Sequence, residues 1–274
     1  MALFNQLTTA LFDVLLAPLG HGRPWFDLAL WPVLGGIAAL LVIKAVSNQG
    51  GITRAKGLIQ VHLLEVVLFR DDLRTVFPAT AKALGYNLRY LAYNVVPMLV
   101  MIVPMTTILV QLVSHYAYAP LRVGDSVTMI VELDDTVGGV TPAEVTLDLP
   151  DGVVLEAPPV RTADGTIAWR LSTTKAGDHV LRVRAGASVE DKLLSVGGPA
   201  RKVSVLRTKG WEALLYPSES VPVAGSPIAS LSILNRRDAP LGPFPVGESG
   251  ILAWFFGASL LAGFLLKDRF GVVL

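Results

Sequence analysis

The sequence predicts a membrane protein with three transmembrane helices, a cytoplasmic helical hairpin and an extracytoplasmic all-β sandwich. Three apolar segments are each about as long as the roughly 20 residues that a helix needs to cross the hydrocarbon core. A stretch between the second and third segments consists instead of short alternating runs separated by Gly, Pro and Asp. Hydrophobic residues make up 52% of the 274 residues and charged residues 16%, a balance unlike that of a wholly soluble protein.

Residues 1–20 predict an amphipathic helix that lies in the membrane interface. The segment is apolar, but Asn5, Thr9 and Asp13 interrupt it, and Pro18 and Gly20 mark its end. No Lys or Arg precedes the apolar residues as in a cleavable signal peptide. The alternative is a disordered leader.

Residues 25–46 predict the first transmembrane helix. Trp25 and Trp31 lie near one end, as in an aromatic belt, and Lys44 lies near the other. Gly35 and Ala39 have the small-xxx-small spacing that lets a second helix approach closely.

Residues 47–94 predict a cytoplasmic hairpin of two helices. Between Ser47 and Asn94 the loop holds six Lys and Arg against three acidic residues, and short basic loops stay in the cytoplasm. Several apolar residues of its second helix share one face. They are Leu73, Phe77, Leu84, Leu88 and Leu91. This face would lie against headgroups or cover a groove; the alternative is a basic anchor and nothing more.

Residues 95–114 predict the second transmembrane helix, with a kinked and polar face. Pro97 and Pro104 each remove an internal hydrogen bond. Thr107 and Gln111 follow at helical spacing, so we expect this face to meet another helix or water.

Residues 118–207 predict the extracytoplasmic β-sandwich. Short alternating runs at roughly ten-residue spacing are typical of such domains, and Trp169 would be the core aromatic residue. The segment from Lys175 to Leu181 resembles the turn and late strand of bacterial immunoglobulin-like modules. This resemblance implies architecture and no ligand.

The remaining segments return the chain to the membrane. Residues 208–248 are Pro-rich and predict an extended return with one strand at Ile228–Leu234. Residues 249–266 predict the third transmembrane helix, with Ser259 and Gly263 as a second close-packing pair. Lys267 and Arg269 place the tail, residues 267–274, in the cytoplasm. The predicted location is the inner (cytoplasmic) membrane, with the N-terminus and the β-domain outside.

No recognisable catalytic pattern is present. The four His lie in different predicted elements, Cys is absent, and neither a GxSxG elbow nor a phosphate-binding glycine loop occurs. We therefore expect no enzyme, no cofactor, no metal and no nucleic acid. The expected partners are the lipid bilayer and either client membrane proteins or other subunits of a membrane complex.

The first two helices and the hairpin together resemble the YidC-type membrane-protein insertase superfamily. The resemblance rests on topology and spacing over about 90 residues: Lys44 near the cytoplasmic end of the first helix, the hairpin Ile52–Tyr93, and the sequences Asn94-Val95-Val96-Pro97 and Val103-Pro104-Met105. The family usually has Arg where this chain has Lys, and its large outer domain, when present, precedes the core.

This resemblance implies a hydrophilic groove through which polar parts of a client cross the membrane. Lys44, Thr107 and Gln111 are the candidate groove residues. A lysine held within the membrane costs about 2.5–3.5 kcal/mol unless water or a partner charge accompanies it. The alternative is that Lys44 only anchors the helix at the interface, and that the chain is a structural or adaptor subunit whose β-domain binds an extracytoplasmic partner.

Overall fold

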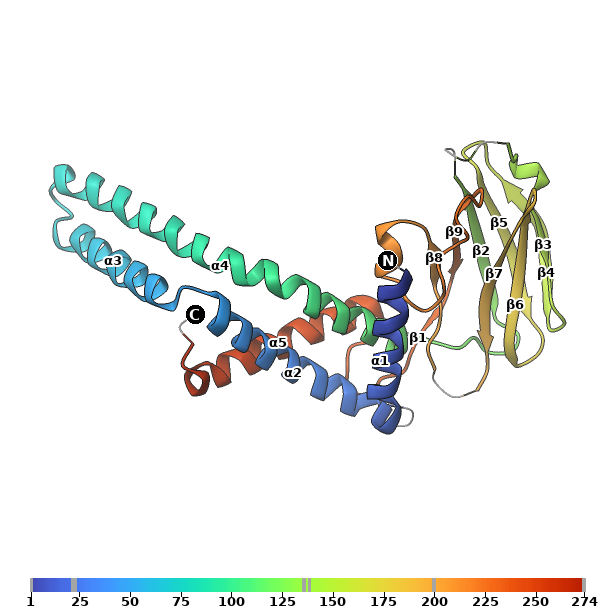
Figure 1. Ribbon diagram of the computed structural model, residues 1–274, viewed down its shortest axis with the longest axis horizontal. Helices are drawn as coiled ribbons and strands as arrows, with labels where there is room; N and C mark the ends of the chain where they lie inside the picture. The colour runs from blue at the N-terminus through green and yellow to red at the C-terminus, as the bar shows by residue number, and fades with distance from the viewer. Residues whose placement is uncertain (1, 21–23, 135–136, 138, 199–200, 273–274) are drawn as a thin grey trace. The chain divides into compact units, whose positions relative to one another are not determined.

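The computed structural model describes residues 2–20, 24–134, 137, 139–198 and 201–272. Residue 1 of the predicted interfacial helix and residues 273–274 of the predicted tail lie outside the described residues. The chain forms two compact units, each described by itself below. The first comprises Met1–Leu28 with Leu109–Trp254, and the second comprises Ala29–Ile108 with Phe255–Leu274. Figure 1 shows the helices and strands along the chain.

Three helices are long and apolar enough to cross a membrane. They are α2 (Pro24–Val46), α4 (Leu73–Tyr116) and α5 (Gly247–Phe270). Each contains one of the three apolar segments predicted from the sequence. By length and composition, the described residues thus include three candidate membrane spans.

Helix α4 runs without interruption from the predicted hairpin into the second predicted span. Its 44 residues include Pro78, Pro97 and Pro104, and at about 1.5 Å per residue it is roughly 65 Å long, about twice the roughly 30 Å hydrocarbon thickness. The boundary expected between residues 94 and 95 is therefore a point within one helix. Near the prolines, the Asn94 amide donates to the Tyr90 carbonyl at 2.8 Å.

The predicted hairpin is formed by α3 (Gln49–Leu68) and the first half of α4. Aromatic residues of α4 meet α3 in antiparallel order. Tyr86 stacks on His62 with ring centroids 5.6 Å apart, and Lys56 lies 5.5 Å from the Tyr90 ring. The contact also buries small residues, Ala79 and Ala83. The predicted leucine-rich face is exposed as a result, with between 52% and 70% of each member accessible.

The β-rich part of the first unit consists of antiparallel strands in three sheets. The five-stranded sheet has the order β4-β5-β2-β9-β8, the three-stranded sheet β3-β6-β7, and a small ribbon pairs β1 with β10. The strand bounds are β1 Tyr118–Ala119, β2 Ser126–Leu133, β3 Thr146–Asp148, β4 Val153–Arg161, β5 Thr166–Thr173, β6 Gly177–Ala185, β7 Ser188–Val196, β8 Leu206–Thr208, β9 Ile228–Leu234 and β10 Arg237–Asp238. Two 3-10 turns occur at Pro142–Glu144 and Trp211–Leu214.

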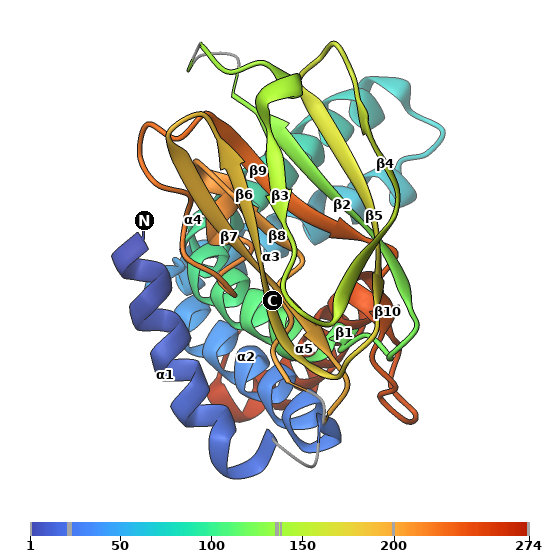
Figure 2. The same ribbon diagram turned by 90° about the vertical axis from the view of Figure 1, so that its right-hand side faces the viewer.

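The two larger sheets enclose one hydrophobic core (Figure 2). It contains Trp169 of β5, as expected, with Met129 of β2 and Leu181 of β6. The strand predicted at Ile228–Leu234 is β9, and it pairs with β2 in the middle of the larger sheet. This pairing corrects the predicted end of the β-domain at residue 207. The 208–248 segment is partly core because the inward side of β9 is apolar.

Helix α1 (Ala2–Gly20) turns a polar stripe towards the rest of the first unit. The Asn5 amide donates to the Ala213 carbonyl at 2.7 Å, and the Gln111 amide donates to the Thr9 hydroxyl at 3.2 Å. One further turn along, Asp13 lies 3.1 Å from the imidazole of His115. Residues spaced by four share a helix face, so the polar interruptions seen in the sequence are contacts to protein.

Candidate functional site

The second unit contains an apolar cavity of about 430 Å³ between α2, α4 and α5. This volume is in the range of about 300–1,000 Å³ found for ligand pockets. Three of the five methionines in the chain line it, at helical spacing along α4: Met98, Met101 and Met105. The unbranched thioether side chain adapts its shape to what it contacts. The cavity wall is therefore both apolar and deformable.

Two polar side chains that line the cavity are already bonded to backbone carbonyls. The Ser259 hydroxyl donates to the Pro32 carbonyl at 2.8 Å, and the Asn94 amide is used by Tyr90 as described above. A buried donor that already has a protein acceptor does not require a hydrogen bond to a ligand or to water. An apolar cavity of this kind stays dry or takes up apolar groups.

The predicted small residues lie where α2 and α5 approach each other. A Cβ added at Gly35 would lie 3.4 Å from the Ser259 hydroxyl, while one added at Gly36 would lie only 2.5 Å from the Ser259 carbonyl oxygen. Ala39 and Gly263 line the cavity. The tightest approach is therefore at Gly36, next to the predicted residue.

The three groove candidates are not brought together at this cavity. None of them is among its lining residues. Lys44 is exposed near the end of α2. The Thr107 hydroxyl donates to the Val103 carbonyl at 2.8 Å, and Gln111 is 1% exposed and bonded to Thr9. Pro97 lines the cavity, whereas Pro104 is exposed. The hydrophilic groove therefore remains a prediction.

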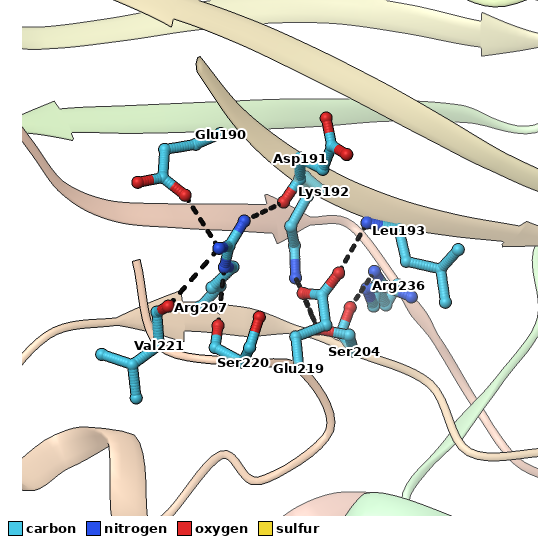
Figure 3. Close-up of polar contacts among 10 residues, drawn as sticks. All are labelled: Glu190, Asp191, Lys192, Leu193, Ser204, Arg207, Glu219, Ser220, Val221 and Arg236. Atoms are coloured by element: carbon cyan, nitrogen blue, oxygen red, sulfur yellow. Dashed lines mark hydrogen bonds and ion pairs between the residues drawn. The ribbon is translucent and has the colours of Figure 1, made fainter. Parts of the chain in front are cut away.

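The β-rich part holds a separate cluster of buried charges (Figure 3). The Lys192 ammonium, fully buried on β7, donates to the Glu219 carboxylate at 2.5 Å and to the Ser204 hydroxyl at 2.6 Å. The other oxygen of Glu219 accepts from the Leu193 backbone N–H at 2.6 Å. The Arg236 guanidinium donates to the Ser204 carbonyl.

A second buried pair extends this cluster along β7. The Arg207 guanidinium lies 2.8 Å from the Glu190 carboxylate and donates to the Ser220 carbonyl at 2.7 Å. Glu190 also accepts from the Val223 backbone N–H at 2.7 Å. Charged side chains thus attach residues 219–223 to β7, the edge strand of the three-stranded sheet.

Burial lowers the pKa of Lys192 from its ordinary value of 10.5 to about 8, although the attraction of Glu219 opposes this change. A lysine with a lowered pKa is a candidate nucleophile. Lys192 has no accessible surface, and its ammonium is bonded to Glu219 and Ser204. The cluster is therefore best explained as a structural attachment of the loop. Removing one partner of a buried ion pair lowers the free energy of unfolding by about 3–5 kcal/mol.

Sequence reasoning missed the methionines, Gly36 and the buried charges. The spacing of Met98, Met101 and Met105 is visible in the sequence and could have identified the cavity. For Lys192 the signal was a charged residue at an inward position of an alternating strand.

Among the described residues, no three His, Asp or Glu side chains gather as metal ligands. The chain matches no protein-family model, and comparisons with curated proteins and with solved structures find no similar protein.

Proposed function

We propose that the chain is a multi-pass integral membrane protein that handles apolar segments of other membrane proteins, as an insertase or chaperone does, without covalent chemistry. The methionine-lined cavity between α2, α4 and α5 carries this proposal. It lies along helices that are long and apolar enough to be in the bilayer.

The cavity can bind an apolar segment by shape, without polar groups that fix one particular ligand. Methionine side chains repack around different apolar partners, as at other promiscuous binding surfaces. A client segment would fill the cavity with side chains of about one helical turn. Such binding tolerates many sequences, which a protein that handles diverse clients requires.

The resemblance to the YidC-type superfamily supports the same assignment through topology. In that reading the hairpin of α3 and α4 is cytoplasmic, and the N-terminus and the β-rich part, an immunoglobulin-like sandwich, face outward. Its location would be the inner membrane. The exposed leucine-rich face of the hairpin would meet the client before the cavity does.

The test is reconstitution of the purified chain in liposomes with a synthetic single-span protein, made by cell-free translation, whose apolar segment contains only Leu and Ala. Liposomes that contain the wild-type chain should protect a larger fraction of the single-span protein from protease than empty liposomes do. The substitution Ala39→Phe fills the cavity and should remove most of that gain. Ala38→Phe is the matched control, because Ala38 is equally half-buried on α2 but does not line the cavity.

Equal protection with wild type and empty liposomes would contradict the insertase proposal. Equal activity of Ala39→Phe and Ala38→Phe would show that the cavity is not the site.

The second candidate function is an adaptor subunit whose β-rich part binds a partner outside the cell membrane. The edge strand β4 favours it, because three of its apolar residues are exposed. They are Val154, Leu155 and Val160, with 47%, 45% and 63% of their surfaces accessible. Two results together would favour the adaptor. Ala39→Phe would leave protection of the single-span protein unchanged, and a subunit that co-purifies stably with the wild-type chain would be released by Val160→Lys.

A further inference from the structure

A second cavity in the helical unit lies between α3 and α4 and has a different character. Its volume is about 220 Å³, smaller than pockets for drug-sized molecules. Two arginines, two tyrosines and the first turn of α3 form most of its wall. The lining residues are Asn48, Gly50, Gly51, Arg54, Ala55, Leu58, Tyr86, Arg89 and Tyr93.

The two arginines have no carboxylate partner among the described residues. No Asp or Glu lines the cavity, and in the hairpin Glu65 pairs with His62 and Asp71 pairs with Arg70. Arg89 donates to the Tyr93 hydroxyl at 3.2 Å, which holds its guanidinium beside the cavity. The cavity therefore carries two uncompensated positive charges.

The arginines of the β-rich part show the contrast. The cavity over β6 and β7 is also lined by three arginines, but each has a carboxylate within ion-pair distance: Arg182 with Asp191, Arg184 with Asp148 and Arg207 with Glu190. Those charges are balanced within the protein, whereas the charges of Arg54 and Arg89 are not.

In a chain that spans the membrane, the α3–α4 cavity would lie at headgroup depth. Asn48 follows the end of α2 at Val46 by two residues, and Tyr93 precedes the apolar stretch of α4. Helices α2 and α4 are both candidate spans. If they cross the bilayer, as the proposed function requires, the cavity opens where phosphate groups of lipids lie. Basic pockets beside membrane helices bind anionic headgroups.

We propose that this cavity binds the phosphate headgroup of an anionic glycerophospholipid. The planar guanidinium groups of Arg54 and Arg89 match phosphate oxygens with paired N–H donors. The Tyr86 and Tyr93 hydroxyls are available as further donors at the rim. The backbone at Gly51 packs closely against Tyr93, because an added Cβ would lie 2.9 Å from the Tyr93 ring. Such a lipid would hold α3 and α4 together at the membrane surface.

The full chain in non-ionic detergent, titrated with short-chain lipids and followed by isothermal calorimetry, tests the proposal. Dioctanoyl phosphatidate and dioctanoyl phosphatidylglycerol should bind, and dioctanoyl phosphatidylcholine should not. Losing one charged hydrogen bond costs about 1.5–3 kcal/mol, so Arg54→Gln and Arg89→Gln should each weaken phosphatidate binding roughly tenfold or more. Arg89→Lys keeps the charge but not the fork and should give an intermediate affinity.

Arg74→Gln is the matched control, because Arg74 lies on α4, is exposed and does not line the cavity. It should change the affinity less than about threefold, as surface substitutions do. An equal loss with Arg74→Gln would mean that only the general positive charge of the hairpin attracts lipid, and the site would be refuted. If inorganic phosphate binds as tightly as dioctanoyl phosphatidate, the ligand is free phosphate and the lipid proposal is refuted. A thermal midpoint unchanged from wild type shows that each variant is folded.

This test separates the inference from the function on which its membrane placement rests. Short-chain lipid binding in detergent needs no insertion activity. If the proposed function is wrong, wild-type and empty liposomes should protect the single-span protein equally while short-chain lipid binding stays intact.

Discussion

Replacing Lys192 by Met should remove a pH dependence of stability that the wild-type chain has. Lys192 is fully buried, and burial lowers the pKa of its ammonium from 10.5 to about 8. The carboxylate of Glu219 faces it and opposes this change, while the charges of Arg236 and Arg207 add to it. Between these two pH values the unfolded chain binds a proton that the folded chain does not bind.

The sign and size follow from linkage. Stability rises with pH wherever the unfolded state binds more protons. Below pH 8 the lysine is charged in both states and its burial costs the full penalty. As pH rises from 8 to 10.5, the penalty is relieved by about 1.4 kcal/mol per pH unit, or about 3 kcal/mol in all.

Guanidinium unfolding of the full chain in detergent, between pH 7 and 9.5, measures this effect. A chain that keeps Trp169 as its only tryptophan reports on the β-rich core by fluorescence. Wild type should gain about 2 kcal/mol between pH 8 and 9.5 from Lys192, by the same linkage. Lys192→Met should gain clearly less, and the rise that remains comes from Lys202, whose pKa burial also lowers. The window ends there because burial raises the pKa of Tyr118, so stability falls again as unfolded tyrosines ionise near pH 10.

Lys175→Met is the matched control, since Lys175 is exposed on the same domain. It should leave the rise unchanged. A flat wild-type profile, or a rise in Lys192→Met as large as that of wild type, would show that Lys192 is not the main titrating group.

Two further predictions concern the helices. Gly36→Ala should lower resistance to SDS-induced unfolding by about 1–3 kcal/mol, as overpacking does, because its Cβ would lie 2.5 Å from a backbone carbonyl of α5; Gly263→Ala, with open space around its Cβ, is the neutral control. The Trp254 indole donates at 2.8 Å to the Leu28 carbonyl, whose usual helical donor is missing because Pro32 has no N–H. Trp254→Phe should therefore cost about 1 kcal/mol, and clearly less when Pro32 is replaced by Ala, in a thermal double-mutant cycle.

Local composition and periodicity are enough to predict much of the fold. The three candidate spans are predictable because length and apolarity are properties of a continuous segment. Trp169 was expected in the core because it lies in an alternating run, and β9 was expected because Ile228–Leu234 is apolar between prolines. What these signals do not contain is the partner of each strand. The pairing of β9 with β2 joins residues about a hundred positions apart.

The candidate sites show the same division. Gly35, Ala39, Ser259 and Gly263 were chosen because small-xxx-small spacing is a local signal for helix packing. Which glycine of α2 lies closest to α5 depends on the register of the two helices, and it is Gly36. The groove residues were chosen for polarity, but Thr107 satisfies its hydroxyl within α4. A single-sequence pattern identifies polar residues in an apolar helix and does not tell whether they meet water, protein or their own backbone.

Site-specific photo-crosslinking tests whether the α2–α4–α5 cavity receives an apolar membrane segment. Benzoylphenylalanine is placed in turn at Met101, which lines the cavity, and at Val103, which is 62% exposed on the same helix and does not line it. Both chains are reconstituted with the Leu/Ala single-span protein and irradiated. We expect crosslinks to the apolar segment from position 101 and few from position 103. Equal crosslinking from both positions, or from position 103 alone, would contradict it.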